Sequence, residues 1–230
     1  MGMPGTLAFV ATPIGNLSDI TLRALETLKA CDLIVCEDTR VTSKLLAGHN
    51  IQKSLSTIHV HSVEKDIVKI IDRIKQGTNV AYVSDAGTPN VNDPGGVLAE
   101  AAFEAGISII PIPGASALTT AMSVCGFPME HFVYLGFAPH KKGRQTFFNE
   151  LSERKEPTVF LESTHRIDKT LDALAETLEP ERLLFVGREL TKMHETLYRG
   201  TAMEVRDRIR ATSEKGEFVV ITGPKPKLKK

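Results

Sequence analysis

The residues best suited to ligand chemistry lie in the segment SDAGTPNVNDPG, residues 84–95. Asp85 and Thr88 can hydrogen-bond to hydroxyl or amino groups, and Gly87 lets a ligand approach the backbone closely. The segment follows the apolar run NVAYV, so it leaves the end of an expected buried strand, where open α/β sheets bind small molecules. It is also longer and richer in turn-forming residues than a connection requires. We therefore expect a ligand-binding loop here.

Three more polar segments follow apolar runs in the same way. They are VATPIGN at residues 10–16, CEDTR at residues 36–40 and PIPGASAL at residues 111–118. Four such loops at strand ends indicate one cleft. The loop TPIGN supplies one glycine where the dinucleotide motif GxGxxG needs three, which disfavours a NAD or FAD site and a dehydrogenase. An ordinary strand-to-helix turn is the alternative for this loop.

Charged side chains follow expected strands in both halves of the chain. In EDTR, Glu37 and Arg40 are either ligand contacts or members of a capped turn in which Arg40 pairs with Glu37. In the second half, ESTHR carries Glu162 and Arg166, and RELTK carries Lys192, which suits them to substrate contact. The alternatives there are a helix cap in ESTHR and a surface ion pair in RELTK.

Composition limits the classes of protein that this chain can represent. With 230 residues, 42% of them apolar and 24% charged, it can bury one large core or two modest ones. The formal net charge is zero, so any site for a polyanion must be local. No apolar run is long enough to span a bilayer, and the N-terminus lacks the features of a signal peptide. We expect a cytoplasmic protein with no membrane contact.

The cysteine and histidine positions argue against a metal site or redox chemistry. The three cysteines form neither an even set nor a CxxC pair, which indicates buried reduced thiols. The seven histidines lack zinc-ligand spacing; His59 and His61 share one expected strand face but have no cysteine or carboxylate partner. The chain also lacks a GxSxG elbow and a P-loop, which disfavours hydrolase and NTPase activity. We expect no metal.

The first half alternates short β-branched runs with helical patterns. TLAFVA, DLIVC, TIHVH, NVAYVS and ISIIPIP are strand candidates. The clearest helix covers residues 64–76, with isoleucines at i, i+3, i+4 and i+7, and Gly77 follows it as the C′ residue. Ser18 and Pro94 are expected to begin two more helices. This alternation predicts a parallel sheet with helices on both faces in a first domain, residues 1–115.

The second domain, residues 116–230, has a different pattern. FVYLGF, TVFLES, RLLFVGR and EFVVIT are strand candidates, and helices are expected over residues 166–178 and near residues 202–211. ETLYRG follows RLLFVGREL too closely for a helix to intervene, so these two segments predict an antiparallel pair. The sequence therefore predicts a two-domain α/β protein with one parallel and one mixed sheet.

The ordered motifs TPIGNLSDIT, EDTR, SDAGTP, DPG, PIPG, SAL, HRI, RELTK, HE, RGT and KGEF resemble the tetrapyrrole methylase superfamily. Within it, the chain is similar to a family of ribosomal RNA methyltransferases, over nearly its whole length. The resemblance implies a class III methyltransferase fold, a homodimer, and S-adenosyl-L-methionine held between the domains. It also implies methylation of the 2′-hydroxyl of a cytidine in the decoding region of 16S ribosomal RNA, in the small ribosomal subunit.

Matching positions of the motifs imply the residues that touch the cofactor. They are Pro13, Ile14, Ala86, Gly87, Thr88, Val91, Ser116, Ala117 and Leu190. This chain departs from the usual pattern where NVND replaces GISD, ESTHR replaces ESPHR and PGAS replaces PGPS. These changes affect details of the expected pocket more than its existence.

Methylation of a ribose hydroxyl needs a positioned acceptor oxygen and a base that takes its proton. Asp85, Glu37 and Glu162 are the candidate bases at strand ends, with Asp85 ranked first and Arg40 beside them. The sequence leaves open whether such a group is a true base or only orients the nucleophile.

Cationic side chains are the expected contacts to RNA phosphates. They are Arg40, Arg166 and Lys192, together with Lys141, Lys142 and Arg144 of the loop HKKGR. A solvated turn is the alternative for HKKGR, and the tail KPKLKK is the next candidate surface. Two other functions remain open: methylation of a tetrapyrrole or another small molecule by the same fold, and RNA binding without catalysis.

Overall fold

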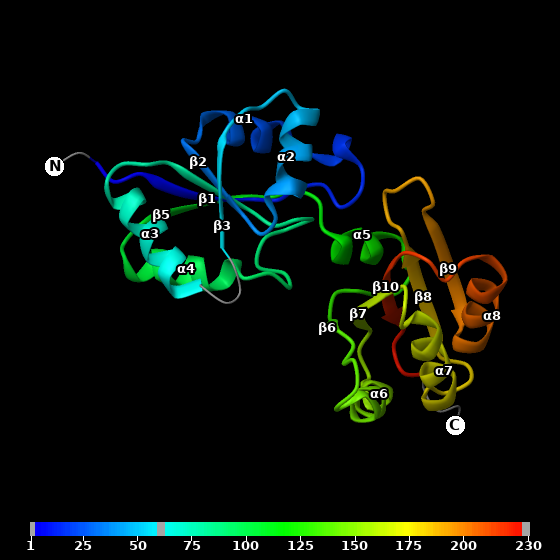
Figure 1. Cartoon of the computed structure of the whole chain (residues 1–230). Coiled ribbons are helices and arrows are strands. Elements are labelled where there is room, and N and C mark those ends of the chain that lie inside the picture. The colour runs from blue at the N-terminus through cyan, green and yellow to red at the C-terminus, as the bar shows by residue number, and fades with distance from the viewer. Residues whose placement is uncertain (1–2, 59–62, 227–230) are drawn as a thin grey trace. The chain divides into compact units, whose positions relative to one another are not determined.

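The computed structural model describes residues 3–58 and 63–226 and divides the chain into two compact units, Met1–Ser116 and Ala117–Lys230 (Figure 1). Each unit is built on one five-stranded sheet, parallel in the first and mixed in the second. The α/β class expected from the sequence is therefore confirmed. In the part of the chain described here, no helix has the length and apolar character needed to cross a membrane.

The parallel sheet of the first unit has the strand order β3-β2-β4-β1-β5. Its strands are β1 (Thr6–Val10), β2 (Leu33–Cys36), β3 (Ser54–Thr57), β4 (Val80–Val83) and β5 (Ser108–Ile112). The strands β1 and β4 are neighbours at the centre of the sheet. The chain leaves β1 toward β2 and β3 at one edge of the sheet, and it leaves β4 toward β5 at the other edge. The strand order therefore reverses between β1 and β4, and such a switch point leaves room for a ligand at the carboxyl ends of the strands.

Helices cover both faces of this sheet, as the sequence pattern predicts. They are η1 (Leu17–Asp19), α1 (Leu22–Ala30), α2 (Thr39–Gly48), α3 (Val63–Lys75) and α4 (Gly95–Glu104). One apolar core lies between the sheet and α3 with α4, and a second lies between the sheet and α1 with α2. Because both faces are covered, β2 and β4 are buried along their whole length and read as continuous apolar runs.

Helix ends in the first unit confirm one predicted cap and correct another. Gly77 adopts φ +100° after α3, and its N–H donates to the carbonyl of Ile74, as expected for a C′ glycine. The predicted cap Ser18 is wrong, because Ser18 lies in η1 with its N–H bonded to the side chain of Asn16. Thr21 is extended and caps α1 instead, through its hydroxyl and the N–H of Ala24.

The strand expected over TIHVH, residues 57–61, is misplaced, because the observed strand begins earlier, at Ser54. The strand β3 covers Ser54–Thr57 and pairs with β2 from Leu33 to Cys36. It lies at the sheet edge and is only partly buried, so its sequence SLST lacks a strong apolar signal. His59 and His61, which the sequence placed on this strand, lie outside the described residues.

The mixed sheet of the second unit has the order β6-β7-β10-β8-β9. Its elements are α5 (Ala117–Val124), β6 (Val133–Phe137), α6 (Arg144–Glu153), β7 (Thr158–Ser163), α7 (Ile167–Thr177), β8 (Leu183–Arg188), β9 (Thr196–Thr201), α8 (Ala202–Thr212) and β10 (Glu217–Thr222). The predicted antiparallel pair is confirmed as β8 with β9, and only β6 and β7 pair in parallel. Helices α6, α7 and α8 pack into one core against this sheet.

Arg182 joins three segments of the second unit. Its side chain is fully buried and donates to the carbonyls of Gly223, Ser152 and Arg154 at 2.9 Å each. These contacts tie the end of α6 and the end of β10 to the start of β8. A cation buried in this way stabilises the unit chiefly by satisfying backbone groups that have lost water.

We predict that Arg182→Ala destabilises the second unit by about 3 kcal/mol or more, because one buried and two partly buried carbonyls lose their donor. Amide hydrogen exchange in β8 and β10 measures this loss for the second unit alone. Lys69→Ala is the control, since Lys69 is 75% exposed in a surface pair with Asp66 and should change stability by less than about 1 kcal/mol. Equal protection of β8 in the parent and in Arg182→Ala would contradict the assigned role.

Candidate active site

Three loops of the first unit meet at the carboxyl ends of β1, β4 and β5. Thr12 and Gly87 form an isolated antiparallel bridge, with reciprocal backbone hydrogen bonds of 2.9 and 3.1 Å. The Thr12 hydroxyl also donates to the carbonyl of Ser84 at 3.2 Å. From the third loop, the carbonyl of Ala115 accepts a hydrogen bond from the Thr88 hydroxyl at 3.2 Å. The segments that the sequence assigned to one site are therefore bonded together.

Gly87 is required at the centre of this junction for two reasons. It adopts φ +84°, a conformation that side chains other than glycine rarely take. A Cβ atom at this position would also lie 3.3 Å from Cγ2 of Ile14, a tighter contact than most real Cβ atoms make. Ile14 is nearly buried, so it has little freedom to move away. Backbone of both loops can consequently approach a ligand here without side-chain bulk.

Asp93 fixes the far end of the loop after β4. One carboxylate oxygen accepts hydrogen bonds from the Tyr82 hydroxyl at 2.9 Å and the Gly95 N–H at 2.8 Å. The other accepts from the Val91 N–H at 3.1 Å. Tyr82 is fully buried, and burial followed by the charge of Asp93 raises the pKa of its hydroxyl, which stays a donor. Asp93 thus sets the position of Val91.

Glu37 and Asp85 connect the loops after β2 and β4. The Glu37 carboxylate accepts the Asp85 N–H at 3.0 Å, and the Asp85 carboxylate accepts the Asp38 N–H at 3.1 Å. Desolvation raises the pKa of Glu37, and the charge of Asp85 adds to this shift. Desolvation likewise raises the pKa of Asp85. Two carboxylates with raised pKa values at a strand edge are suited to proton transfer.

The partner of Arg40 differs from the one that the sequence suggested for a capped turn. EDTR does form a capped turn, because Asp38 caps α2 and accepts the Arg40 N–H. The Arg40 guanidinium pairs with Asp38 at 2.6 Å, however, and not with Glu37. This pairing lowers the pKa of Asp38 to about 2 and leaves Glu37 free of an arginine partner among the described contacts. Arg40 itself remains 85% exposed and can meet a substrate.

Glu162, the third candidate base, is buried inside the second unit. It is 1% exposed and pairs with Arg166 at 2.7 Å, and its other oxygen accepts the Thr170 hydroxyl at 2.6 Å. Arg144 completes the cluster, 3.6 Å from Glu162 and 2.6 Å from the Thr170 hydroxyl. A carboxylate enclosed in this way is suited to structural support, which favours Asp85 and Glu37 over Glu162 as the candidate base.

RELTK forms a tight turn between β8 and β9. Glu189 and Thr191 adopt φ +51° and φ +65°, so two residues other than glycine hold left-handed conformations around Leu190. Leu190 packs against Gly187, where a Cβ atom would lie 2.9 Å from its side chain. Lys192 is held by Glu189 and Glu217, at 3.0 Å from each. Such constrained conformations often occur at functional sites.

The predicted site residues thus fall into two groups. Pro13, Ile14, Ala86, Gly87, Thr88 and Val91 lie in the bonded loops of the first unit, as do the catalytic candidates Asp85, Glu37 and Arg40. Ser116 and Ala117 lie at the start of α5, and Leu190 lies in the RELTK turn. Over residues 3–58 and 63–226, His, Cys, Asp and Glu form no group of three able to hold a metal.

Sequence reasoning missed Thr12, Tyr82 and Asp93, which support the site without an obvious motif. A signal for Asp93 existed, because an aspartate directly before Pro-Gly commonly accepts nearby backbone N–H groups. Thr12 and Tyr82 gave no such signal, since their partners lie in other loops and only folding brings them together.

The chain matches a family described as Tetrapyrrole (Corrin/Porphyrin) Methylases over residues 6–206. It is 41% identical to a protein named Ribosomal RNA small subunit methyltransferase I from Haemophilus influenzae, over 98% of this chain and 81% of that one. A protein of the same name from Neisseria meningitidis is 45% identical, over 96% of this chain and 76% of that one. The protein of this name from Thermotoga maritima is 41% identical, over 96% of this chain and 99% of that one.

Solved structures with a similar fold carry other names. A uroporphyrin-III-C-methyltransferase from Thermus thermophilus has a TM-score of 0.67 and 21% identity, over 95% of this chain and 94% of that one. A cobalt precorrin-4 methyltransferase has a TM-score of 0.68 and 17% identity, over 95% of this chain and 94% of that one. At such low identity these structures establish the fold alone.

We predict that Tyr82→Phe destabilises the first unit by about 1.5–3 kcal/mol, because the lost hydrogen bond is to a charged carboxylate. Tyr198→Phe is the matched control: its hydroxyl bonds to the neutral Thr212 hydroxyl at 2.7 Å and should cost about 0.5–1.5 kcal/mol. Amide exchange in β4 and in β8 measures the two effects separately. If Tyr82→Phe cost no more than Tyr198→Phe, Asp93 would not be the anchor described above.

Proposed function

Because the chain belongs to the tetrapyrrole (corrin/porphyrin) methylase family, we propose that it is an S-adenosyl-L-methionine-dependent methyltransferase of 16S ribosomal RNA. The proposed target is the ribose 2′-hydroxyl of a cytidine in the decoding region. The observation that carries the proposal is the 41–45% identity, over 96–98% of the chain, to proteins named for methylation of small-subunit ribosomal RNA. A tetrapyrrole substrate is the second candidate, and it rests on structures only 17–21% identical.

The bonded loops of the first unit fit the cofactor. Gly87 and Ala86 expose backbone because their side chains are absent or small, and Ile14 and Val91 offer apolar surface. The Thr88 hydroxyl lies beside them and donates to the carbonyl of Ala115. When bound, S-adenosyl-L-methionine supplies an electrophilic methyl group on a sulfonium sulfur. Pro13 completes this proposed set in the first unit. Ser116, Ala117 and Leu190 belong to the proposal through the family resemblance.

Asp85 is the proposed base. It would accept the proton that the ribose hydroxyl loses as the hydroxyl oxygen gains the methyl group. An O–C bond would form, the O–H bond and the S–C bond of the methyl donor would break, and the electron pair of the S–C bond would leave with the sulfur as a neutral thioether. Glu37 holds the loop in place by accepting the Asp85 N–H. Arg40, exposed beside them, orients the substrate through its charge.

Among the six cations expected to contact RNA, Arg40, Lys141 and Lys142 are exposed. Arg144 and Arg166 are committed to Glu162, and Lys192 to Glu189 and Glu217. We therefore assign phosphate contact to the two lysines, orientation of the substrate to Arg40, and a supporting role to Arg144, Arg166 and Lys192. The partner is the small ribosomal subunit in the cytoplasm.

Methyl transfer from labelled cofactor tests the proposal and its rivals. Small ribosomal subunits, naked 16S RNA and a uroporphyrinogen are compared as acceptors under the same conditions. Label in the RNA supports the proposal, whereas label in the uroporphyrinogen alone assigns the enzyme to small molecules. Binding of RNA with no cofactor affinity by calorimetry would indicate a module without catalysis.

We predict that Gly87→Leu abolishes cofactor binding, because the side chain must enter the 3.3 Å gap to Ile14 in a left-handed conformation. Isothermal titration calorimetry measures the affinity. Gly106→Leu is the matched control, since Gly106 also has a positive φ of +67° but nothing within 4 Å of its Cβ position. Equal affinity in the parent and Gly87→Leu would mean that the cofactor binds elsewhere.

We predict that Asp85→Asn lowers kcat by on the order of a hundredfold or more and leaves cofactor affinity nearly unchanged. Desolvation raises the pKa of Asp85, so this carboxyl ionises at a higher pH than an ordinary aspartate does. The parent should therefore lose activity on acidification at a higher pH than an ordinary aspartate would give. Asp72→Asn, on the exposed side of α3, is the control. Unchanged turnover in Asp85→Asn would move the chemistry to Glu37.

We also propose a homodimer, because the family resemblance implies one and symmetric pairing doubles the cationic surface of a chain with zero net charge. Light scattering at micromolar concentration should give about twice the chain mass. A monomer mass with full activity is the result that rejects the dimer.

A further inference from the structure

An aromatic side chain is exposed where β6 ends in the second unit. Phe137, the last residue of β6, is 52% exposed, although phenylalanines of this unit such as Phe148 and Phe160 are buried. The register between β6 and β7 shifts between Tyr134 and Phe137, and Gly136 adopts φ +66°. Bulges of this kind re-aim a side chain. The backbone therefore holds Phe137 outward at the edge of the sheet.

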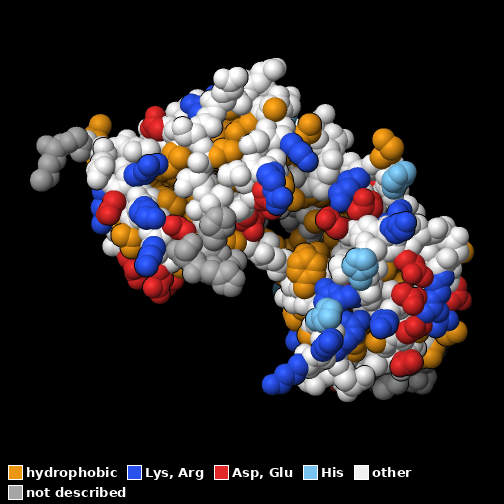
Figure 2. All heavy atoms as spheres, in the orientation of Figure 1, with side chains coloured by type: hydrophobic (Ala, Val, Ile, Leu, Met, Phe, Trp, Pro, Cys, Tyr) orange, Lys and Arg blue, Asp and Glu red, His pale blue; other side chains and the backbone are white. Residues whose placement is uncertain are grey.

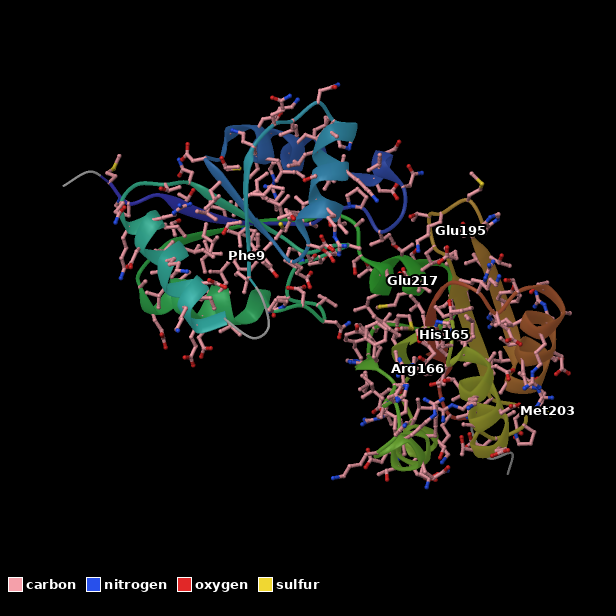
Figure 3. The ribbon with its side chains drawn as sticks, viewed as in Figure 1. Phe9, His165, Arg166, Glu195, Met203 and Glu217 are labelled. Carbon is pink, nitrogen blue, oxygen red and sulfur yellow. The ribbon has the colours of Figure 1, made fainter. Side chains whose placement is uncertain are left out.

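A second ring lies at the end of the neighbouring strand. His165 is exposed in the turn that joins β7 to α7, beside Arg166 (Figure 3). The strands β6 and β7 are parallel, and Phe137 pairs in register with Leu161. Their carboxyl ends therefore lie at the same end of the sheet, which places Phe137 and His165 at that end.

Two arginines fix the backbone between these rings. Arg166 donates to the carbonyl of Ala138 at 2.8 Å, and Arg144 donates to the carbonyl of Pro139 at 3.1 Å. Both arginines also pair with the buried Glu162. The loop after Phe137 is thus held against the turn that carries His165, and the surface is formed in advance.

The same surface is positively charged in a chain whose net charge is zero. Lys141 and Lys142 are exposed on the loop, and Lys169 is exposed one turn into α7. Glu162, the acidic residue of this cluster, is buried and matched by two arginines, so it does not cancel the lysines. Figure 2 shows Lys, Arg and His side chains gathered on one face of this unit.

We propose that Phe137, His165, Lys141 and Lys142 bind an unpaired segment of RNA, with a base stacked on the rings and phosphates on the lysines. This inference rests on the proposed function and adds the form of RNA that the enzyme takes. A duplex hides its base faces, whereas an unpaired strand exposes them to aromatic side chains beside a basic groove. A basic surface alone would need no exposed phenylalanine.

Fluorescence anisotropy without cofactor tests the proposal, using a labelled single-stranded RNA and a hairpin whose stem pairs the same bases and whose loop is a linker without bases. Phe137→Ala should weaken single-strand binding by roughly 5- to 150-fold, because stacking is worth about 1–3 kcal/mol per base, and should leave hairpin binding unchanged. The double variant Lys141→Ala, Lys142→Ala should reduce the salt slope for the single strand by about 1.4, whereas Phe137→Ala should not change it. Phe137→Trp should restore affinity.

Matched controls lie in the first unit. Phe103 is 74% exposed on α4, and Lys65 and Lys69 are exposed on α3, so Phe103→Ala and Lys65→Ala, Lys69→Ala should leave RNA affinity unchanged. Parent-like single-strand affinity in Phe137→Ala overturns the stacking role. Equal weakening of single-strand and hairpin binding overturns the preference for unpaired RNA.

Methyl transfer to small subunits, measured on the same variants, separates this inference from the proposed function. If the parent methylates the RNA and Phe137→Ala does so with unchanged KM and RNA affinity, only this inference fails. If the parent binds the single strand through Phe137 yet transfers no methyl group, only the proposed function fails. A third outcome is that Phe137→Ala keeps the parent's affinity for RNA but loses affinity for assembled subunits. That result would assign the surface to contact with a ribosomal protein, and it would overturn the proposed RNA contact.

Discussion

The backbone bridge between Thr12 and Gly87 is the interaction on which the candidate site depends. It joins the loops after β1 and β4 at the point where the strand order of the sheet reverses. A parallel sheet brings the carboxyl ends of its strands to one edge, but loops at that edge can still diverge. The bridge prevents this, and only a glycine allows it, because position 87 combines a positive φ with close contact to Ile14.

Three carboxylates that follow strands in the sequence differ in what they can do chemically. Glu37 and Asp85 accept backbone N–H groups, and desolvation raises the pKa of each carboxyl. Glu162 is enclosed with two arginines and a threonine hydroxyl. Its charge is fully compensated inside the protein. The number of cationic partners, and not the residue type, distinguishes these two environments.

The pairing of Glu162 with two arginines also shapes the cationic surface of the second unit. Arg144 and Arg166 pair with the buried Glu162 and also donate to the carbonyls of Pro139 and Ala138, so they anchor the start of the loop that follows β6. The lysines on that loop remain available to solvent. A chain with no net charge can thus present a local cationic region beside an exposed aromatic ring.

The sequence by itself determined most of the elements and the motifs, because apolar periodicity and glycine positions act locally. The helix α3 with Gly77 at its end and the β8–β9 pair are examples, whereas the edge strand β3 and the cap of α1 were misplaced. It also predicted which loops carry the candidate site. Tertiary structure alone decided the partners: Arg40 with Asp38, Glu162 with two arginines, and Tyr82 with Asp93. Ion pairs and hydrogen bonds between side chains depend on distances of a few ångströms between segments far apart in the chain. Residue order does not specify those distances.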